Sequence, residues 1–81
     1  MPVDYIKIDG SFIRDVADDP ADLALVRSIN EMGHLMGKRT IAEYVENDRI
    51  RECLRSIGVD FVQGYGVEQP RPLDSLSQMA G

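Results

Sequence analysis

Four polar side chains near the predicted ends of short apolar segments could do chemistry together. They are Lys7, Asp9, Glu43 and Gln63. Residues two apart in a strand share a face, so Lys7 and Asp9 are expected to point the same way. Carboxylates at one edge could bind a small anionic nucleotide, because a metal ion can bridge carboxylate and phosphate oxygens.

A simpler explanation of these residues is solvation. Strand ends meet water, so a single lysine or glutamate there is more often an ordinary surface residue. Three strand ends that each present a polar group to one edge weaken this explanation without removing it, and both readings stay open at this point.

Three segments with strand patterns must position these residues. Residues 3–9 alternate with period two, which places Ile6 and Ile8 on one face and the polar residues on the other. Residues 40–45 and 60–63 are predicted to be the second and third strands.

Two helices are predicted between the strands. Residues 21–36 carry an apolar series at helical spacing, which we expect to face the core: Leu25, Ile29, Met32 and Met36. Gly33 inside this helix costs about 1 kcal/mol relative to alanine, so it indicates close packing. A second helix follows the expected N-cap Asn47 and carries its own buried stripe: Ile50, Cys53, Leu54 and Ile57. The lone His34 is expected to have a structural or surface role, and residues from Pro70 onward are expected to form an exit loop or a frayed end.

The order β-α-β-α-β with short connections predicts an α/β fold with a parallel sheet and right-handed crossovers. Helices on one side would leave the other sheet face bare, whereas parallel sheets normally have both faces covered. A (β/α)8 barrel solves this problem, since the bare face becomes the barrel interior. In such barrels the chemistry lies at the carboxyl ends of the strands.

Composition narrows the function classes. The chain of 81 residues has a formal net charge of −5, and an acidic surface repels the backbone of DNA and RNA, so no DNA or RNA partner is expected. Its single cysteine, Cys53, fits a reducing cytoplasm. The apolar runs are far shorter than the ~20 residues of a membrane span, so no membrane segment is expected in this chain, although the parent protein could be anchored elsewhere.

Three motifs resemble one known family. Residues 1–12 resemble the sixth-strand motif of EAL domains, and residues 41–46, Ile-Ala-Glu-Tyr-Val-Glu, resemble the seventh-strand motif. Residues 63–66, Gln-Gly-Tyr-Gly, followed by Pro-Arg-Pro at 70–72, resemble the eighth-strand motif. The motifs follow in the family's order and spacing up to about residue 73. The chain is thus identified as the C-terminal part of an EAL domain, of the cyclic di-GMP phosphodiesterase family.

This resemblance implies a fold and an activity. EAL domains are modified TIM-like (β/α)8 barrels, and this chain would supply the last three strands. They hydrolyse cyclic di-GMP to the linear dinucleotide pGpG with Mg²⁺ or Mn²⁺. Residues 1–73 would then be the C-terminal portion of the domain, and residues 74–81 a tail.

The motifs also imply residue roles. Lys7 would contact the attacking water or the phosphate, and Asp9 would lie beside the metals or their waters. Glu43 would be the carboxylate near the water and a candidate base. Glu46 would hold the loop that carries metal ligands, and Gln63 would line the nucleotide site. Such groups suit metal-assisted phosphodiester hydrolysis, in which cations neutralise charge, a lysine adds to it and a carboxylate takes a proton.

The sequence contains neither the family's Glu-Ala-Leu signature nor its Asp-Asp-Phe-Gly segment. In the family, those regions supply most metal ligands, so the main metal cage is expected to be absent from this chain. We therefore expect a piece of an EAL domain whose parent is an enzyme and which is inactive in isolation.

Two other functions stay open. The parent could be a degenerate EAL domain that senses cyclic di-GMP or docks a protein. The chain could also act as an interaction fragment through bare strand edges at 3–9 and 61–67. In the family, the helix corresponding to 22–36 lies near a dimer contact, so a homodimer is a further expectation.

Overall fold

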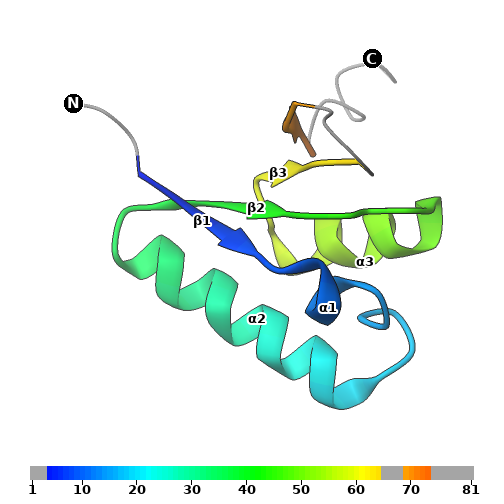
Figure 1. The fold of residues 1–81 in the computed structure, drawn as a ribbon. Coiled ribbons are helices and arrows are strands. Elements are labelled where there is room, and N and C mark those ends of the chain that lie inside the picture. Colours follow the sequence, from blue (N-terminus) through cyan, green and yellow to red (C-terminus); the bar gives the residue numbers. More distant parts are fainter. Residues whose placement is uncertain (1–3, 65–68, 74–81) are drawn as a thin grey trace.

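A computed structural model describes residues 4–64 and 69–73 and gives the path of the chain there (Figure 1). The expected start of the first strand, the end of the third motif and the tail 74–81 lie outside these residues. The described elements, in chain order, are β1 (Tyr5–Ile8), α1 (Gly10–Ile13), α2 (Pro20–Leu35), β2 (Arg39–Ala42), α3 (Asp48–Ile57), β3 (Phe61–Val62) and β4 (Arg71–Pro72).

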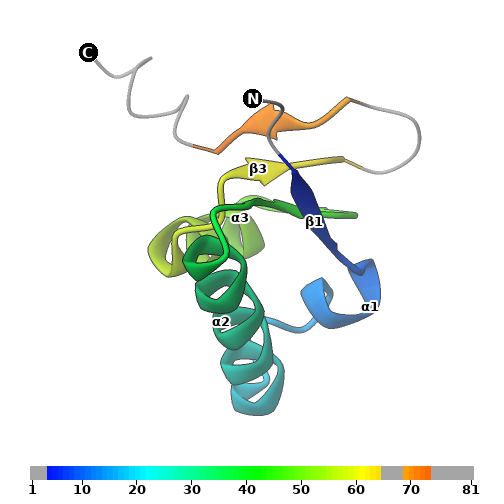
Figure 2. The same cartoon turned by 90° about the vertical axis from the view of Figure 1, so that its left-hand side faces the viewer.

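The sheet confirms the predicted parallel arrangement. Its strand order is β1-β2-β3-β4, and the first three strands run parallel, with Ile8 beside Ala42 and Ala42 beside Val62. The two connections between these strands contain α2 and α3, as in a β-α-β-α-β unit. Figure 2 shows both helices on the same side of the strands.

The exit loop or frayed end expected from Pro70 onward is a wrong prediction for Arg71–Pro72. Arg71–Pro72 instead form β4, which pairs antiparallel with β3. Leu73 is 2% exposed, and its N–H donates to the Asp60 carbonyl at 2.9 Å. Apolar burial of Leu73 explains why the chain turns back here. Because β4 covers the outer edge of β3, Phe61–Val62 is not the bare edge that the sequence suggested.

Side chains of the parallel strands alternate between the two faces of the sheet, as the period-two pattern of residues 3–9 predicts. Ile8, Ala42 and Val62 are buried on the helix-covered side. The opposite face carries residues in register at the neighbouring positions Lys7, Ile41 and Phe61. There the rings of Tyr5 and Phe61 meet edge to face, with centroids 5.7 Å apart. This second face therefore also carries bulky side chains, as the interior face of a barrel would.

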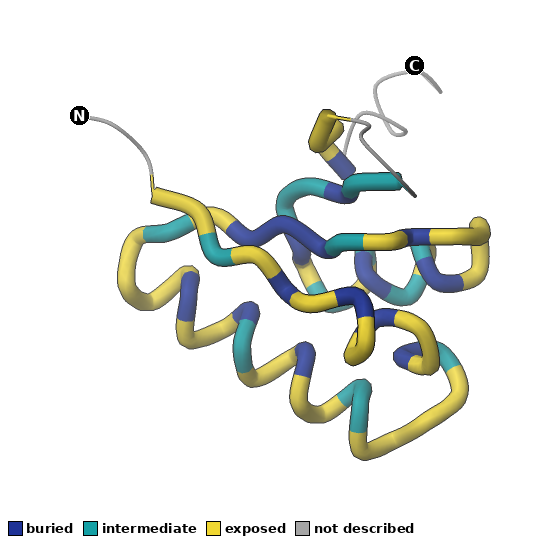
Figure 3. The backbone as a smooth tube through the Cα atoms, in the orientation of Figure 1, coloured by how far each residue is buried: buried dark blue, intermediate teal, exposed yellow. Residues whose placement is uncertain are grey.

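Helix α2 begins one residue earlier than predicted and turns a different stripe inward. Asp19 caps it, accepting from the Ala21 N–H at 2.9 Å, and Pro20 opens the first turn. Its buried residues are Val26, Asn30 and Gly33. Figure 3 shows the buried parts of α2 on the side of the helix that faces the strands.

The apolar series expected to face the core is largely outside. Leu25, Met32 and Met36 are 40%, 62% and 58% exposed, and only Ile29 packs partly against the core. The apolar pattern predicted the wrong inner face for α2 because the true inner face contains the polar Asn30 and Gly33, which has no side chain. A Cβ added at Gly33 would lie 3.1 Å from Ile6 and 3.2 Å from Thr40, so the close packing predicted for this glycine is confirmed.

Helix α3 agrees with its sequence pattern. Asn47 caps it by accepting from the Ile50 N–H at 2.9 Å, and Gly58 ends it with φ 101°. Ile50 and Leu54 are buried, while Cys53 and Ile57 are half-buried against the core.

A hydrogen-bonded cluster ties α2 to the amino-terminal ends of the strands. The Thr40 hydroxyl donates to Asn30 Oδ1 at 2.5 Å, and the Thr40 N–H donates to Asp60 Oδ2 at 2.9 Å. His34 Nε2 lies 2.7 Å from the same Asp60 oxygen, which fits the structural role expected for this histidine. Thr40 and Asn30 are 0% and 2% exposed, so this cluster satisfies polar groups that water cannot reach.

Candidate functional site

The three parallel strands end at the same edge of the sheet. Main-chain hydrogen bonds continue past the strand ends and position the residues that follow them. The Glu43 N–H donates to the Ile8 carbonyl at 3.1 Å, and the Gln63 N–H donates to the Ala42 carbonyl at 2.9 Å. The Val45 N–H in turn donates to the Gln63 carbonyl at 3.1 Å. Glu43 and Gln63 are therefore positioned by the backbone of the sheet itself.

Three of the predicted site residues line one small pocket at this edge. Lys7, Glu43 and Gln63 surround a space of about 100 Å³ together with Tyr44 and Gly64. We call this the Lys7 pocket. A cation, a carboxylate and an amide thus face one space, each contributed by a different strand or the residue after it.

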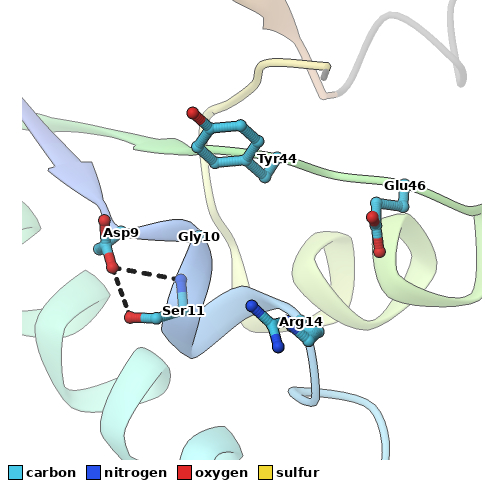
Figure 4. Close-up of a pocket in the computed structure, with 6 residues that line it drawn as sticks. All are labelled: Asp9, Gly10, Ser11, Arg14, Tyr44 and Glu46. Carbon is cyan, nitrogen blue, oxygen red and sulfur yellow. Dashed lines mark hydrogen bonds between the residues drawn. The ribbon is translucent and has the colours of Figure 1, made fainter. Parts of the chain in front are cut away.

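The other two predicted residues line a second pocket. Asp9 and Glu46 belong to a space of about 240 Å³ (Figure 4), here called the Arg14 pocket, whose remaining lining is Gly10, Ser11, Arg14 and Tyr44. The five candidate residues are therefore divided between two pockets, and Tyr44 lines both.

The structure corrects the prediction that Asp9 lies in the first strand and shares a face with Lys7. Strand β1 ends at Ile8, and Asp9 instead caps the short helix α1, which the sequence analysis missed. Its Oδ2 accepts from the Ser11 hydroxyl and from the Ser11 N–H at 3.2 Å. The order Asp-Gly-Ser could have signalled this turn, since aspartate is a preferred N-cap residue.

The hydrogen bonds around Asp9 also affect its acidity. The Ser11 hydroxyl, followed by the Ser11 N–H, stabilises the charged carboxylate and lowers the pKa of Asp9 below its ordinary value of 3.8. The side chain is exposed, so water screens it. Asp9 therefore contributes a negative charge to the Arg14 pocket at neutral pH.

Tyr44 is a site residue that sequence reasoning did not single out, as are Ser11 and Arg14. It is 48% exposed and has φ 60°, a left-handed conformation that few bulky residues adopt. A Cβ added at Gly10 would lie 2.9 Å from both Cβ and Cγ of Tyr44, so the tyrosine lies directly against the glycine. Figure 4 shows the ring above Gly10, between Asp9 and Glu46.

The donor groups fit part of a divalent metal site. Mg²⁺ and Mn²⁺ prefer oxygen ligands, which Asp9, Glu43 and Glu46 offer. These carboxylates are divided between the two pockets. Within residues 4–64 and 69–73, no three His, Cys, Asp or Glu side chains gather closely enough to hold a metal ion.

No helix among the described residues is long and apolar enough to cross a membrane.

Comparison with curated proteins gives close relatives along nearly the whole chain. The cyclic di-GMP phosphodiesterase PdeB of Shewanella oneidensis is 45% identical over 96% of the chain. The cyclic di-GMP phosphodiesterase PdeF of Escherichia coli is 43% identical over 94% of the chain. The chain spans only 9% and 10% of the lengths of these two relatives.

Solved structures of EAL proteins share the fold. The EAL enzyme Bd1971, in a form bound to cAMP and cyclic di-GMP, matches 98% of the chain at 34% identity with a TM-score of 0.75, and the match covers 21% of Bd1971. BlrP1 of Klebsiella pneumoniae, in a complex with manganese and cyclic di-GMP, matches 86% at 28% identity with a TM-score of 0.74, over 18% of its length.

The family model described as "EAL domain" matches residues 1–70. Solved EAL domains are of the TIM-barrel type, and the present sheet with its two helices corresponds to a part of such a barrel. The chain therefore belongs to the EAL domain family.

Proposed function

We propose that the EAL domain to which this chain belongs hydrolyses cyclic di-GMP to pGpG, and that Lys7, Glu43 and Gln63 work in its active site. The observation that carries the proposal is the Lys7 pocket, which brings these three residues together at the carboxyl ends of parallel strands. The relatives PdeB and PdeF, both named cyclic di-GMP phosphodiesterases, support the same activity.

Each of the three side chains has a role that suits phosphodiester hydrolysis. Glu43 accepts a proton from the attacking water as a general base. The ammonium group of Lys7 stabilises the negative charge that grows on the phosphoryl oxygens. The Gln63 amide can both donate and accept hydrogen bonds, so it orients the nucleotide.

Mg²⁺ or Mn²⁺, when bound, would neutralise phosphate charge and lower the pKa of a bound water. Glu43 and Asp9 are the residues proposed to face the metals or their waters. Ser11 donates two hydrogen bonds to Asp9 Oδ2 and so fixes the carboxylate that would help to hold a metal or its waters. Glu46, in the Arg14 pocket, is proposed to hold a neighbouring loop that carries further ligands.

The pocket volumes bear on how much of the site this chain provides. Pockets for drug-sized ligands are typically about 300–1,000 Å³. The Lys7 and Arg14 pockets, at about 100 and 240 Å³, are smaller than that range. We propose that the 81-residue chain alone does not turn over cyclic di-GMP, and that other strands of the barrel complete both the substrate cleft and the metal cage.

The remaining assignments follow from the same proposal. Residues 1–73 are assigned to the domain and residues 74–81 to a tail. The formal net charge of −5 argues against DNA or RNA as a partner. A nucleotide substrate and a single cysteine together favour a cytoplasmic domain.

A homodimer through α2 is also proposed. The exposed apolar residues of this helix offer a contact surface: Leu25, Met32, Leu35 and Met36. Analytical ultracentrifugation of the wild type and of Met32→Glu would test this proposal. A charge placed in the contact surface should convert the dimer to a monomer. A wild-type protein that is monomeric at all concentrations would contradict the dimer.

The experiment for the activity uses the full-length protein as it is encoded, with Mn²⁺ and cyclic di-GMP, and chromatography of pGpG. Wild-type turnover is expected, with a loss of about 10²-fold or more in Lys7→Met, in the range that removal of an electrostatic group from an active site gives. Lys38→Met, immediately before β2 and away from the Lys7 pocket, is the matched control. Binding without hydrolysis in the wild type would contradict the enzyme and favour a sensor domain.

A further inference from the structure

Tyr44 occupies a place that its own conformation disfavours. With φ 60° it lies in the left-handed region, which glycine adopts readily and in which a residue with a Cβ atom is strained. It also forces its neighbour to be small, because a Cβ at Gly10 would lie 2.9 Å from Tyr44 Cβ and Cγ. Two local backbone features thus accommodate one aromatic side chain.

The backbone turn alone does not explain this side chain. The turn at Tyr44 separates Glu43, in the Lys7 pocket, from Glu46, in the Arg14 pocket. A glycine would make the same turn with less strain, so the turn gives no reason for a ring. Strained residues of this kind cluster at ligand sites, where the rest of the fold holds them in place.

The surroundings of the ring indicate what it could contact. Tyr44 is 48% exposed and lines both pockets, so the side chain borders the space where Lys7 and Glu43 lie and the space where Arg14 lies. It is the aromatic residue shared by two otherwise polar linings in the described part of the chain. Flat aromatic faces beside charged groups suit a nucleotide, whose base stacks while its phosphate meets the charges.

We propose that Tyr44 is a substrate-binding residue whose ring stacks on a purine base of the dinucleotide, next to the phosphate held at the Lys7 pocket. This inference rests on the proposed cyclic di-GMP activity and deepens it. Stacking also accounts for the strain, since a left-handed backbone raises the ring over Gly10 at the boundary of the two pockets (Figure 4).

The test measures the binding of two ligands to the full-length protein as it is encoded, with Mn²⁺ present. Linear pGpG carries bases, whereas inorganic phosphate carries none. Tyr44→Leu keeps an apolar side chain without the ring, Tyr44→Asn suits the left-handed backbone, and Tyr44→Phe keeps the ring. Calorimetry gives the Kd of pGpG, competition gives that of phosphate, and a thermal melt checks that each variant is folded.

The Leu and Asn variants are expected to bind pGpG about 5- to 150-fold more weakly than the Phe variant, the range found when a base-stacking aromatic is removed. Their affinity for phosphate should fall much less. Equal pGpG affinity in all three variants would overturn the inference and leave the proposed activity standing. Proportional losses for pGpG and phosphate would also overturn it, since they indicate a structural role. A wild type that binds neither cyclic di-GMP nor pGpG would overturn both.

Discussion

Gly10→Ala tests the contact that divides the two pockets. The added methyl group would meet Tyr44 at Cβ and Cγ, each 2.9 Å away. These atoms are close to the main chain, so the tyrosine cannot swing aside without moving the backbone between Glu43 and Val45. The overlap is therefore expected to shift the site as well as to destabilise the fold.

The size of the effect follows from two opposing contributions. Overpacking costs about 1–3 kcal/mol. Alanine gains up to about 1 kcal/mol over glycine inside a helix, and the four-residue α1 allows only part of that gain. We expect a net destabilisation of about 1–2 kcal/mol, which lowers the midpoint of urea unfolding by about 1 M for a slope near 1.5 kcal/mol per M.

The assay is a double-mutant cycle read by urea unfolding. Tyr44→Gly removes the obstructing side chain, so adding it to Gly10→Ala should recover most of the loss and give a coupling of about 1–2 kcal/mol. Gly37→Ala is the matched control, because Gly37 has φ 75° but no atom within 4 Å of an added Cβ. Its cost should simply add to that of Tyr44→Gly. A Gly10→Ala protein as stable as the wild type would show that Tyr44 does not restrict the side chain at position 10.

Two further predictions concern groups at opposite ends of the parallel strands. Thr40→Val removes the hydroxyl that donates to Asn30 Oδ1 and leaves this buried acceptor unpaired, so the free energy of unfolding should fall by about 1–3 kcal/mol. Thr40→Ser keeps the hydroxyl and should lose less. Equal stabilities of the two variants and the wild type in urea would contradict the buried cluster. Ser11→Ala should raise the pKa of Asp9 toward its ordinary 3.8 in a carboxylate NMR titration. Because the folded pKa is lowered, the stability from this bond is present above about pH 4 and is lost as pH falls through the folded value; an unchanged Asp9 titration would refute it.

The sequence predicted the parallel sheet well because its signals are local. The alternation around Ile6 and Ile8, the cap Asn47 and the stripe on α3 each depend on a few neighbouring residues, and the structure confirms them. The third strand and its polar end followed from the same kind of pattern, and Gln63 duly meets Glu43 in one pocket.

The sequence-based predictions fail where tertiary contacts determine which residues are buried and which segments pair. Asn30 is buried because Thr40 and the Ile57 carbonyl satisfy it, and no helical pattern can show partners that lie elsewhere in the chain. Strand β4 forms because Leu73 fills a place in the core, which turned a Pro-Arg-Pro segment into an edge strand. Tyr44 was overlooked because its importance comes from a positive φ and from Gly10, and neither appears in an alternating strand pattern.

Glu43→Gln tests whether the residues of the Lys7 pocket catalyse hydrolysis together. The full-length protein as it is encoded would be compared with this variant and with the control Glu31→Gln, on the exposed side of α2. With Mn²⁺, Glu43→Gln should still bind cyclic di-GMP but form pGpG at least about 10²-fold more slowly, since a general base contributes that much. Glu31→Gln should match the wild type, whereas wild-type turnover by Glu43→Gln would contradict the role assigned to this pocket.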